Sequence, residues 1–340
     1  TGNIYKTKVD WDLGQSNFVL NGNIAMDLAR WPNNTDGDPF TLNSKRNSGG
    51  SGANTVNNAF LTSSEIPNIN WKGGAVFFYG DKSGSGWLAW KANITSSTTG
   101  RVNFNLDKNP TWIRTFHAPQ DKGDFYLEGV KGALDYQNEW WFNKNTKELF
   151  VIMPNGGAPA NGTVKMRRRI VAIDLSDRDY IIIENLAVLG GEIHMNNTSD
   201  FNTIKGVSSF YGNHSQGVFK GFASDSQSVL MQGKNNTIER CEIAFGSGNG
   251  IKVGGADNKI LNSKIHDFNY LGSYDAPINA RGGVKTKIIN NTIYRGGRDG
   301  VQFFNNDSEF AYNDVYQANM IADDCALLYT VGGPHRGEIH

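Results

Sequence analysis

Three aspartates recur near the end of the chain at almost constant spacing. Asp275, Asp299 and Asp324 follow one another at steps of 24 and 25 residues, and Asn249 lies one step earlier. If each step is one turn of a repeating structure, these side chains stack on one face. Two carboxyl groups held together can cleave a glycosidic bond, because one donates a proton while the other acts in ionised form. The spacing therefore predicts an acidic candidate active site.

The separation between the carboxyl groups decides which chemistry such a site performs. Retaining glycosidases hold the pair about 5–5.5 Å apart, and inverting enzymes about 6.5–9.5 Å. Coils of a parallel β-solenoid lie about 4.8 Å apart, so Asp299 with Asp324 fits the short separation and Asp275 with Asp324 the long one. We expect Asp299 and Asp324 to be the catalytic pair, either one being the acid, with Asp323 assisting or merely flanking. The alternatives are a calcium site and inert turn residues.

A second motif sets the period of the repeat. An apolar residue is followed three positions later by Asn, Cys or Ser and five positions later by an aliphatic residue. The motif begins at Ile238, Ile260, Ile288 and Phe310. Repeats of this length, with short strands and turns rich in Gly and Asn, are typical of a parallel β-solenoid whose equivalent residues form ladders. The sequence predicts an all-β fold with a right-handed parallel β-helix, in which Asn291 and Asn313 are rungs of one ladder that satisfies turn backbone groups.

Tryptophan marks a change of architecture along the chain. All eight tryptophans precede residue 142, and segments 86–92, 124–127 and 148–152 have the pattern of antiparallel strands. We expect an N-terminal antiparallel β-barrel or sandwich domain over residues 1–164 and the β-helix over residues 165–340. Residues 337–340 have the pattern of another coil, so we expect the β-helix to be truncated there, with the rest of the same polypeptide supplying further coils.

Composition excludes several classes of function. The 33 basic and 33 acidic residues give no net charge, and no phosphate-binding loop or zinc cluster is present, so the sequence predicts no nucleic-acid partner. No run approaches the roughly 18 apolar residues of a membrane span, which predicts no membrane partner. The 2 cysteines are too few for a disulfide framework.

Three groups of motifs carry a resemblance to a known family. They are residues 20–22 with 29–33, residues 133–135 with 138–144 and 148–151, and the Asp-Asp-containing segment 322–333. Together these motifs resemble the parallel β-helix glycoside hydrolases that include β-xylosidases, xylanases and α-L-fucosidases. Asp299-Gly-Val-Gln followed by Asp323-Asp324-Cys325 and a His335-bearing loop has a weaker similarity to polygalacturonases. The chain departs from both patterns, with Cys325 after the Asp pair and Arg298 before the first Asp.

The resemblance implies a carboxylate-based hydrolase that needs no cofactor and acts on a plant or algal polysaccharide or its oligosaccharides. By analogy with the extracellular polymers that this architecture acts on, we expect a secreted or periplasmic protein. Seven residues around the acids are candidates for holding the sugar by charge, hydrogen bonding or stacking: Asp275, Arg281, Arg298, His335, Arg336, Tyr329 and His266. No metal ligand is assigned.

Two other functions remain open at this level. A polysaccharide lyase acting on a uronate-containing glycan needs a Lys, Arg, His or Tyr base and often calcium, and Lys285, Arg281 and Tyr329 are available. A non-catalytic solenoid would bind a carbohydrate polymer along one face without cleaving it.

Overall fold

A computed structural model describes residues 3–53, 55–83, 86–106, 117–214, 226–332 and 335–340. Within that part, the chain forms two compact units. The first ends at Arg168, and the second begins at Arg169. None of the helices in the described residues has the length and hydropathy that a bilayer span requires.

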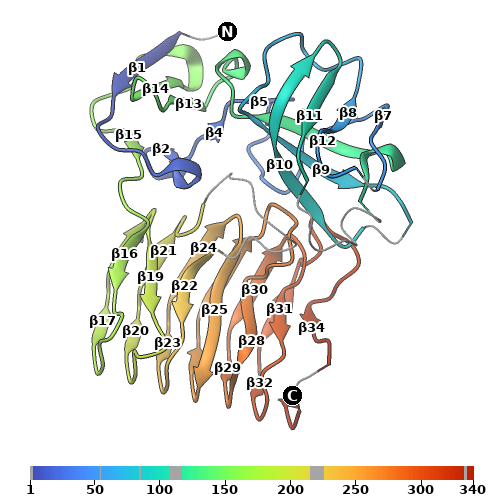
Figure 1. Cartoon of the computed structure of the whole chain (residues 1–340). Helices are drawn as coiled ribbons and strands as arrows, with labels where there is room; N and C mark the ends of the chain where they lie inside the picture. Colours follow the sequence, from blue (N-terminus) through green and yellow to red (C-terminus); the bar gives the residue numbers. More distant parts are fainter. Residues whose placement is uncertain (1–2, 54, 84–85, 107–116, 215–225, 333–334) are drawn as a thin grey trace. The chain divides into compact units, whose positions relative to one another are not determined.

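In its described residues, the first unit contains three sheets built from fifteen strands, most of which are labelled in Figure 1. A four-stranded sheet has the order β1 (Ile4–Lys8), β14 (Glu148–Ile152), β13 (Glu139–Asn143) and β4 (Asp27–Leu28), and a three-stranded sheet has the order β15 (Val164–Met166), β2 (Val19–Asn21) and β3 (Ile24–Ala25). The eight-stranded sheet runs β5 (Arg30–Trp31), β12 (Gly123–Glu128), β9 (Ala75–Gly80), β10 (Ala89–Thr98), β11 (Arg101–Phe104), β8 (Ala59–Thr62) and β7 (Gly49–Gly50), with β6 (Lys45–Arg46) also pairing β12.

Antiparallel pairing dominates this first unit. Among its described strands, only β13 and β4 pair in parallel. Its core is aromatic: Trp71, Phe77 and Phe78 are fully buried, and Trp90 packs on Phe78 with ring centroids 5.1 Å apart. Large aromatic side chains bury much apolar area for each ordered residue, which suits a unit made of many short strands.

The second unit is a parallel β-helix made of three sheets (Figure 1). The first β-helix sheet contains β16 (Val171–Asp174), β19 (Glu192–Met195), β22 (Gln227–Met231), β25 (Asn249–Ala256), β28 (Ile278–Val284), β31 (Val301–Phe303) and β34 (Leu328–Tyr329). The second contains β17 (Ile182–Glu184), β20 (Thr203–Lys205), β23 (Thr237–Glu239), β26 (Lys259–Leu261), β29 (Lys287–Ile289), β32 (Glu309–Ala311) and β35 (Glu338–Ile339). The third contains β18 (Ala187–Leu189), β21 (Ser208–Phe210), β24 (Glu242–Gly246), β27 (Lys264–Phe268), β30 (Thr292–Gly296) and β33 (Asp314–Tyr316). The predicted all-β fold, with an antiparallel N-terminal unit followed by a parallel β-helix, is confirmed.

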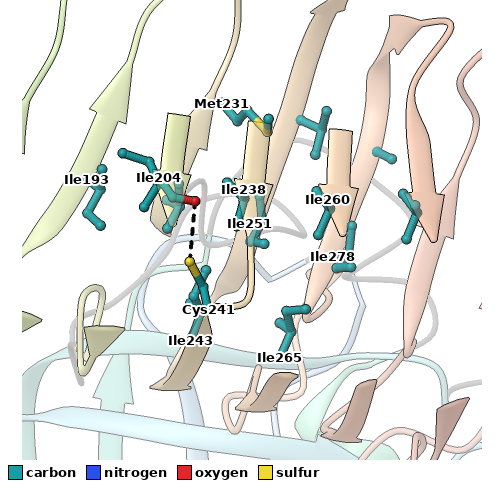
Figure 2. Packing of buried hydrophobic residues seen from close by; sticks show 14 of the residues in the cluster. Ile193, Ile204, Met231, Ile238, Cys241, Ile243, Ile251, Ile260, Ile265 and Ile278 are labelled. Carbon is teal, nitrogen blue, oxygen red and sulfur yellow. Dashed lines mark hydrogen bonds between the residues drawn. The ribbon is translucent and has the colours of Figure 1, made fainter. Parts of the chain in front are cut away.

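Aliphatic ladders fill the interior of the β-helix. On the first sheet the paired residues Ile193, Val229, Ile251, Ile278 and Val301 are all buried. The equivalent ladder of the second sheet is Ile204, Ile238, Ile260, Ile288 and Phe310. Both ladders belong to one buried cluster, and Figure 2 shows part of it, where the Cys241 thiol lies 3.5 Å from the Ile204 carbonyl oxygen. Because successive side chains of a strand point to opposite faces of the sheet, the residues next to each rung of the first ladder along the strand face outward.

Polar ladders satisfy the backbone at the turns. The carboxamide oxygen of Asn313 accepts the Asn291 backbone N–H at 2.9 Å, and the Asn291 oxygen accepts the Ser263 N–H at 2.9 Å, which confirms the predicted Asn rungs. A second ladder, which the sequence motif did not reveal, links Asn202, Asn236 and Asn258 in the same way. In each rung the side-chain oxygen accepts a hydrogen bond from a backbone N–H at a turn, where strand pairing supplies no acceptor.

Candidate functional site

The acidic residues lie at the amino ends of three neighbouring strands of the first β-helix sheet. The paired residues Ile278, Val301 and Leu328 fix the register of β28, β31 and β34. Asp275, Asp299 and Asp324 precede these residues by three, two and four positions. The predicted column of equivalent aspartates is therefore wrong in register, because buried apolar residues align the coils and the segments before β28 and β34 are longer. The acids nonetheless remain on consecutive coils.

Asp275 is a buried residue that is hydrogen-bonded to side chains of its own coil and of the preceding coil. Its carboxylate accepts a hydrogen bond from Asn249 Nδ2 at 2.7 Å and another from Ser273 Oγ. The Asn249 oxygen in turn accepts bonds from the Ala276 backbone N–H and from Asn279 Nδ2, at 3.1 and 3.0 Å. Asp275 therefore holds the polar side chains of neighbouring coils in place.

Asp299 forms a buried ion pair with the residue before it. Arg298 Nη1 donates to Asp299 Oδ2, and both side chains are at most 1% exposed. Gln302 Nε2 donates to the same oxygen at 2.8 Å, while Asp299 Oδ1 makes no hydrogen bond of normal geometry within the described residues. Burial raises the pKa of Asp299, and the Arg298 charge and the Gln302 hydrogen bond oppose that shift. The pKa of Asp299 is therefore raised above that of an exposed aspartate even though a cation lies beside it.

Aromatic rings enclose the Arg298 guanidinium. It lies 3.9 Å from the ring centroid of Tyr274 and 4.9 Å from that of Tyr329, and the two tyrosine hydroxyls are 3.3 Å apart. Burial raises the pKa of Tyr274 to about 12, with the Tyr329 hydrogen bond adding to the effect. Arg281 stands over the same Tyr274 ring, 5.0 Å from its centroid. The structure thus brings four of the predicted residues together: Asp299, Arg298, Tyr329 and Arg281.

Asp323 and Asp324 are exposed, in the segment that precedes β34. The pKa of the adjacent Cys325 thiol depends on the charges of both aspartates and on those of Arg298 and Asp299. Burial raises the pKa of the Cys325 thiol to about 12, the Arg298 charge opposes this, and the charges of Asp299, Asp324 and Asp323 reinforce it. One exposed acidic pair and one buried carboxyl group therefore act on the same thiol.

Three predicted substrate-binding residues lie elsewhere on the coils. His266 belongs to the third β-helix sheet, where its ring stacks on Tyr294 at 4.5 Å and its Nδ1 is 2.7 Å from Asp267 Oδ2. His335 and Arg336 contact the turn after β31, at the opposite end of that strand from Asp299. There the His335 backbone N–H donates to Asn306, and Arg336 pairs with Asp307. These residues are close to the acids in sequence. Each coil contributes strands to three different sheets, however, so these residues lie on another sheet or at the other end of the first one.

The outward ladder of the first sheet contains Tyr329, which the sequence predicted for the site, and three residues that the sequence analysis did not assign to it. Lys252, Asn279, Gln302 and Tyr329 are paired in register and follow directly after the buried rungs. The alternation of inward and outward residues after Ile251 was the signal that could have identified them.

No metal site emerges from the described residues, where no three His, Cys, Asp or Glu side chains are gathered so that they could hold an ion.

Comparison with known proteins places this geometry in a known fold. A family model described as "Right handed beta helix region" matches residues 191–336. The second unit is a right-handed parallel β-helix. A solved structure titled "Glycoside hydrolase" is similar over 98% of this chain and 80% of its own, with 11% identity and a TM-score of 0.54. At that identity the likeness shows the fold alone.

Two further solved structures are matched at lower structural similarity. The mannuronan C-5 epimerase A-module of Azotobacter vinelandii is matched at 14% identity over 49% of this chain and 58% of its own, with a TM-score of 0.28. The catalytic domain of a GH87 α-1,3-glucanase in complex with nigerose is matched at 14% identity over 100% of this chain and 61% of its own, with a TM-score of 0.30. The chain thus spans less than two thirds of the length of each. A search of curated proteins finds no match.

Proposed function

We propose that this protein is a glycoside hydrolase that cleaves a polysaccharide or its oligosaccharides, with Asp299 and Asp324 as its two carboxyl groups. One observation supports the proposal above others. A buried carboxyl group with a raised pKa and an exposed acidic pair precede consecutive strands of one sheet, and the charges of all three acids raise the pKa of the Cys325 thiol. Two carboxyl groups in opposite environments are what acid–base cleavage of a glycosidic bond requires.

In this proposal Asp299 is the acid and Asp324 the ionised partner. At rest Asp299 pairs with Arg298, and burial raises its pKa; in this proposal it carries a proton to the leaving oxygen of the sugar once the bound substrate has displaced Arg298. Asp324, which is exposed, attacks the sugar or activates water, and Asp323 assists it. Because Asp299 is fully buried, the substrate must first displace part of the layer formed by Arg298, Tyr274 and Tyr329. That displacement would also exclude water from the acid.

The substrate and location follow from the same proposal. The fold shared with a solved glycoside hydrolase is consistent with a plant or algal polysaccharide as substrate. Such polymers lie outside the cytoplasm, so the protein would be secreted or periplasmic. Hydrolysis by two carboxyl groups requires no cofactor.

Carboxylate-to-amide variants test the proposed function. Wild-type protein and the variants Asp299→Asn and Asp324→Asn are incubated with defined plant and algal glycans, and the products are identified by mass. We expect hydrolysis of at least one glycan and a loss of turnover of about a thousandfold or more in each variant. Asp314→Asn is the matched control, because Asp314 is exposed on β33 of the third sheet.

Three outcomes would contradict the glycosidase proposal. Full turnover in Asp324→Asn would remove the exposed acid from the mechanism, and this variant changes only an exposed side chain, so misfolding would not confuse the result. An unsaturated product that absorbs in the ultraviolet would indicate a lyase. Glycan binding by the wild type without any cleavage would indicate a non-catalytic solenoid.

A further inference from the structure

A groove of about 560 Å³ lies on the outer face of the first β-helix sheet. It is formed by residues of four consecutive coils, within the second unit alone. Its lining residues with polar or charged side chains are Asn197, Gln232, Lys234, Lys252, Asp275, Asn279 and Arg281. The volume is within the range of small-ligand sites, and one sugar ring with part of its neighbours would fit.

The charge of the groove differs from that of the whole chain. Lys234, Lys252 and Arg281 contribute three positive charges, and among the described lining residues Asp275 is the only acid. The Asp275 carboxylate is buried and accepts hydrogen bonds from Asn249 and Ser273. The complete chain has zero net charge, so this local excess of cations is a property of the groove. A concave surface of one sign concentrates ligands of the opposite sign.

Glycine forms the floor of the groove. Gly254 pairs with Gly282, and Gly255 pairs with Gly283, just after a point where β28 carries one residue more than β25. A Cβ atom added at Gly282 would meet nothing within 4 Å. The floor is therefore bare backbone, which a flat ring can approach closely, while the amides of Gln232 and Asn279 stand beside it.

The extra residue in β28 connects the groove to the candidate active site. The register shift falls between Asn279 and Gly282, the stretch of β28 that contains Arg281. Arg281 lines the groove and also stands over the Tyr274 ring, which in turn covers Arg298. A polymer lying in the groove would therefore continue toward the Asp299 carboxyl group.

We infer that this groove binds an anionic sugar residue, carboxylated or sulfated, with Lys252 and Arg281 facing the acid group. The inference rests on the function proposed above, since it names the substrate class for the same site. A strongly solvated cation such as lysine and a planar guanidinium both pair with carboxylates and sulfates, and neither is needed to hold a neutral sugar.

Binding without turnover tests the inference. The Asp324→Asn protein is titrated by calorimetry with trigalacturonate, with its methyl ester, which has the same rings without charge, and with a sulfated carrageenan tetrasaccharide. We expect at least one of the two anionic probes to bind about tenfold or more tightly than the ester, and added salt to weaken that binding. Comparing the carboxylated and sulfated probes identifies which acid group is preferred.

Two groove variants and one control variant locate the binding to the groove. Lys252→Gln with Arg281→Gln should reduce the affinity for the preferred anion to that for the ester, while Lys264→Gln, an exposed lysine on the third sheet, should leave it unchanged. Gly282→Leu should weaken both charged and neutral probes at least about tenfold, because its side chain would occupy the open floor.

The results that would overturn the inference are distinct from those that would overturn the proposed function. Equal affinity for trigalacturonate, the carrageenan and the ester, no binding of either anion at millimolar concentration, or binding unaffected by Lys252→Gln with Arg281→Gln would each refute it. Charge-selective binding by a protein that hydrolyses nothing would refute the hydrolase and leave the groove assignment in place. Hydrolysis of neutral glycans alone, with no preference for anionic probes, would refute the groove assignment and leave the hydrolase proposal in place.

Discussion

Arg298 and Asp299 are neighbours in sequence and form an ion pair that is almost completely buried, with side chains 1% and 0% exposed. Two charges removed from water in this way stabilise a fold little in themselves, but each becomes costly when the other is lost. Tyr274 and Tyr329 lie over the guanidinium, so the pair is also part of an aromatic cluster. The relationship joins the stability of the last coils to the chemistry proposed for Asp299.

Breaking the pair from the arginine side should destabilise the protein. Arg298→Met leaves Asp299 buried without its cation, and we expect the free energy of unfolding to fall by about 3–5 kcal/mol. The double variant Arg298→Met with Asp299→Asn should recover part of that loss, because no buried charge remains. Chemical denaturation followed by circular dichroism measures both. If the double variant were as unstable as the single one, the cost would come from lost packing on the tyrosines.

The pH dependence of glycan cleavage should report the proton on Asp299. A general acid acts only when protonated, so activity should fall as the pH rises through the raised pKa of this carboxyl group. The Gln302 hydrogen bond lowers that pKa, and Gln302→Met removes it. The alkaline limb of kcat/KM should therefore move to higher pH in Gln302→Met. A shift to lower pH, or no shift, would exclude Asp299 as the acid.

The Asn ladder should be a strong contributor to stability of the β-helix. Asn291→Ala removes the partner of the Ser263 backbone N–H and of the Ile260 carbonyl oxygen, which Asn291 Nδ2 contacts at 3.0 Å. We expect a loss of about 1–3 kcal/mol for each backbone group left buried and unpaired. Lys264→Ala, at an exposed position of the neighbouring coil, should change stability by less than about 0.5 kcal/mol. Equal effects in thermal unfolding would show that the ladder does not stabilise the coil.

Acid should destabilise the first unit through His117. This side chain is 1% exposed, its ring lies 5.2 Å from that of Trp87, and burial lowers its pKa to about 4. The unfolded chain binds the proton near pH 6.5 and the folded chain only near pH 4. The stability due to the neutral ring is therefore present above pH 6.5 and is lost as the pH falls between these values, by about 3 kcal/mol at most.

A substitution that cannot titrate isolates this effect of His117. Between pH 7 and pH 4.5 the melting temperature of His117→Phe should fall less than that of the wild type, whatever the two values are at pH 7. Parallel falls in both proteins would show that His117 does not determine the acid sensitivity.

The sequence determined the architecture because the interior of a β-helix repeats. Ile238, Ile260, Ile288 and Phe310 recur since each coil must bury an equivalent side chain against the next, and this constraint is visible in the order of residues. Asn291 and Asn313 were predictable for the same reason. The ladder of Asn202, Asn236 and Asn258 forms the same bonds from backbone N–H to side-chain oxygen, but these residues are not part of the repeated motif that begins at Ile238.

The candidate site was decided by tertiary structure, because turns between coils vary in length and only the paired strands fix which side chains meet. Counting residues placed Asp275, Asp299 and Asp324 in one phase, while the register set by the buried rungs shifts them by one or two positions. Burial is likewise absent from the sequence: it seals Asp299 beneath Arg298 and leaves Asp324 in solvent. The chain by itself determined that acids would gather on consecutive coils. Only packing of the coils decided that burial raises the pKa of Asp299, since a pKa depends on the surroundings of a group in space.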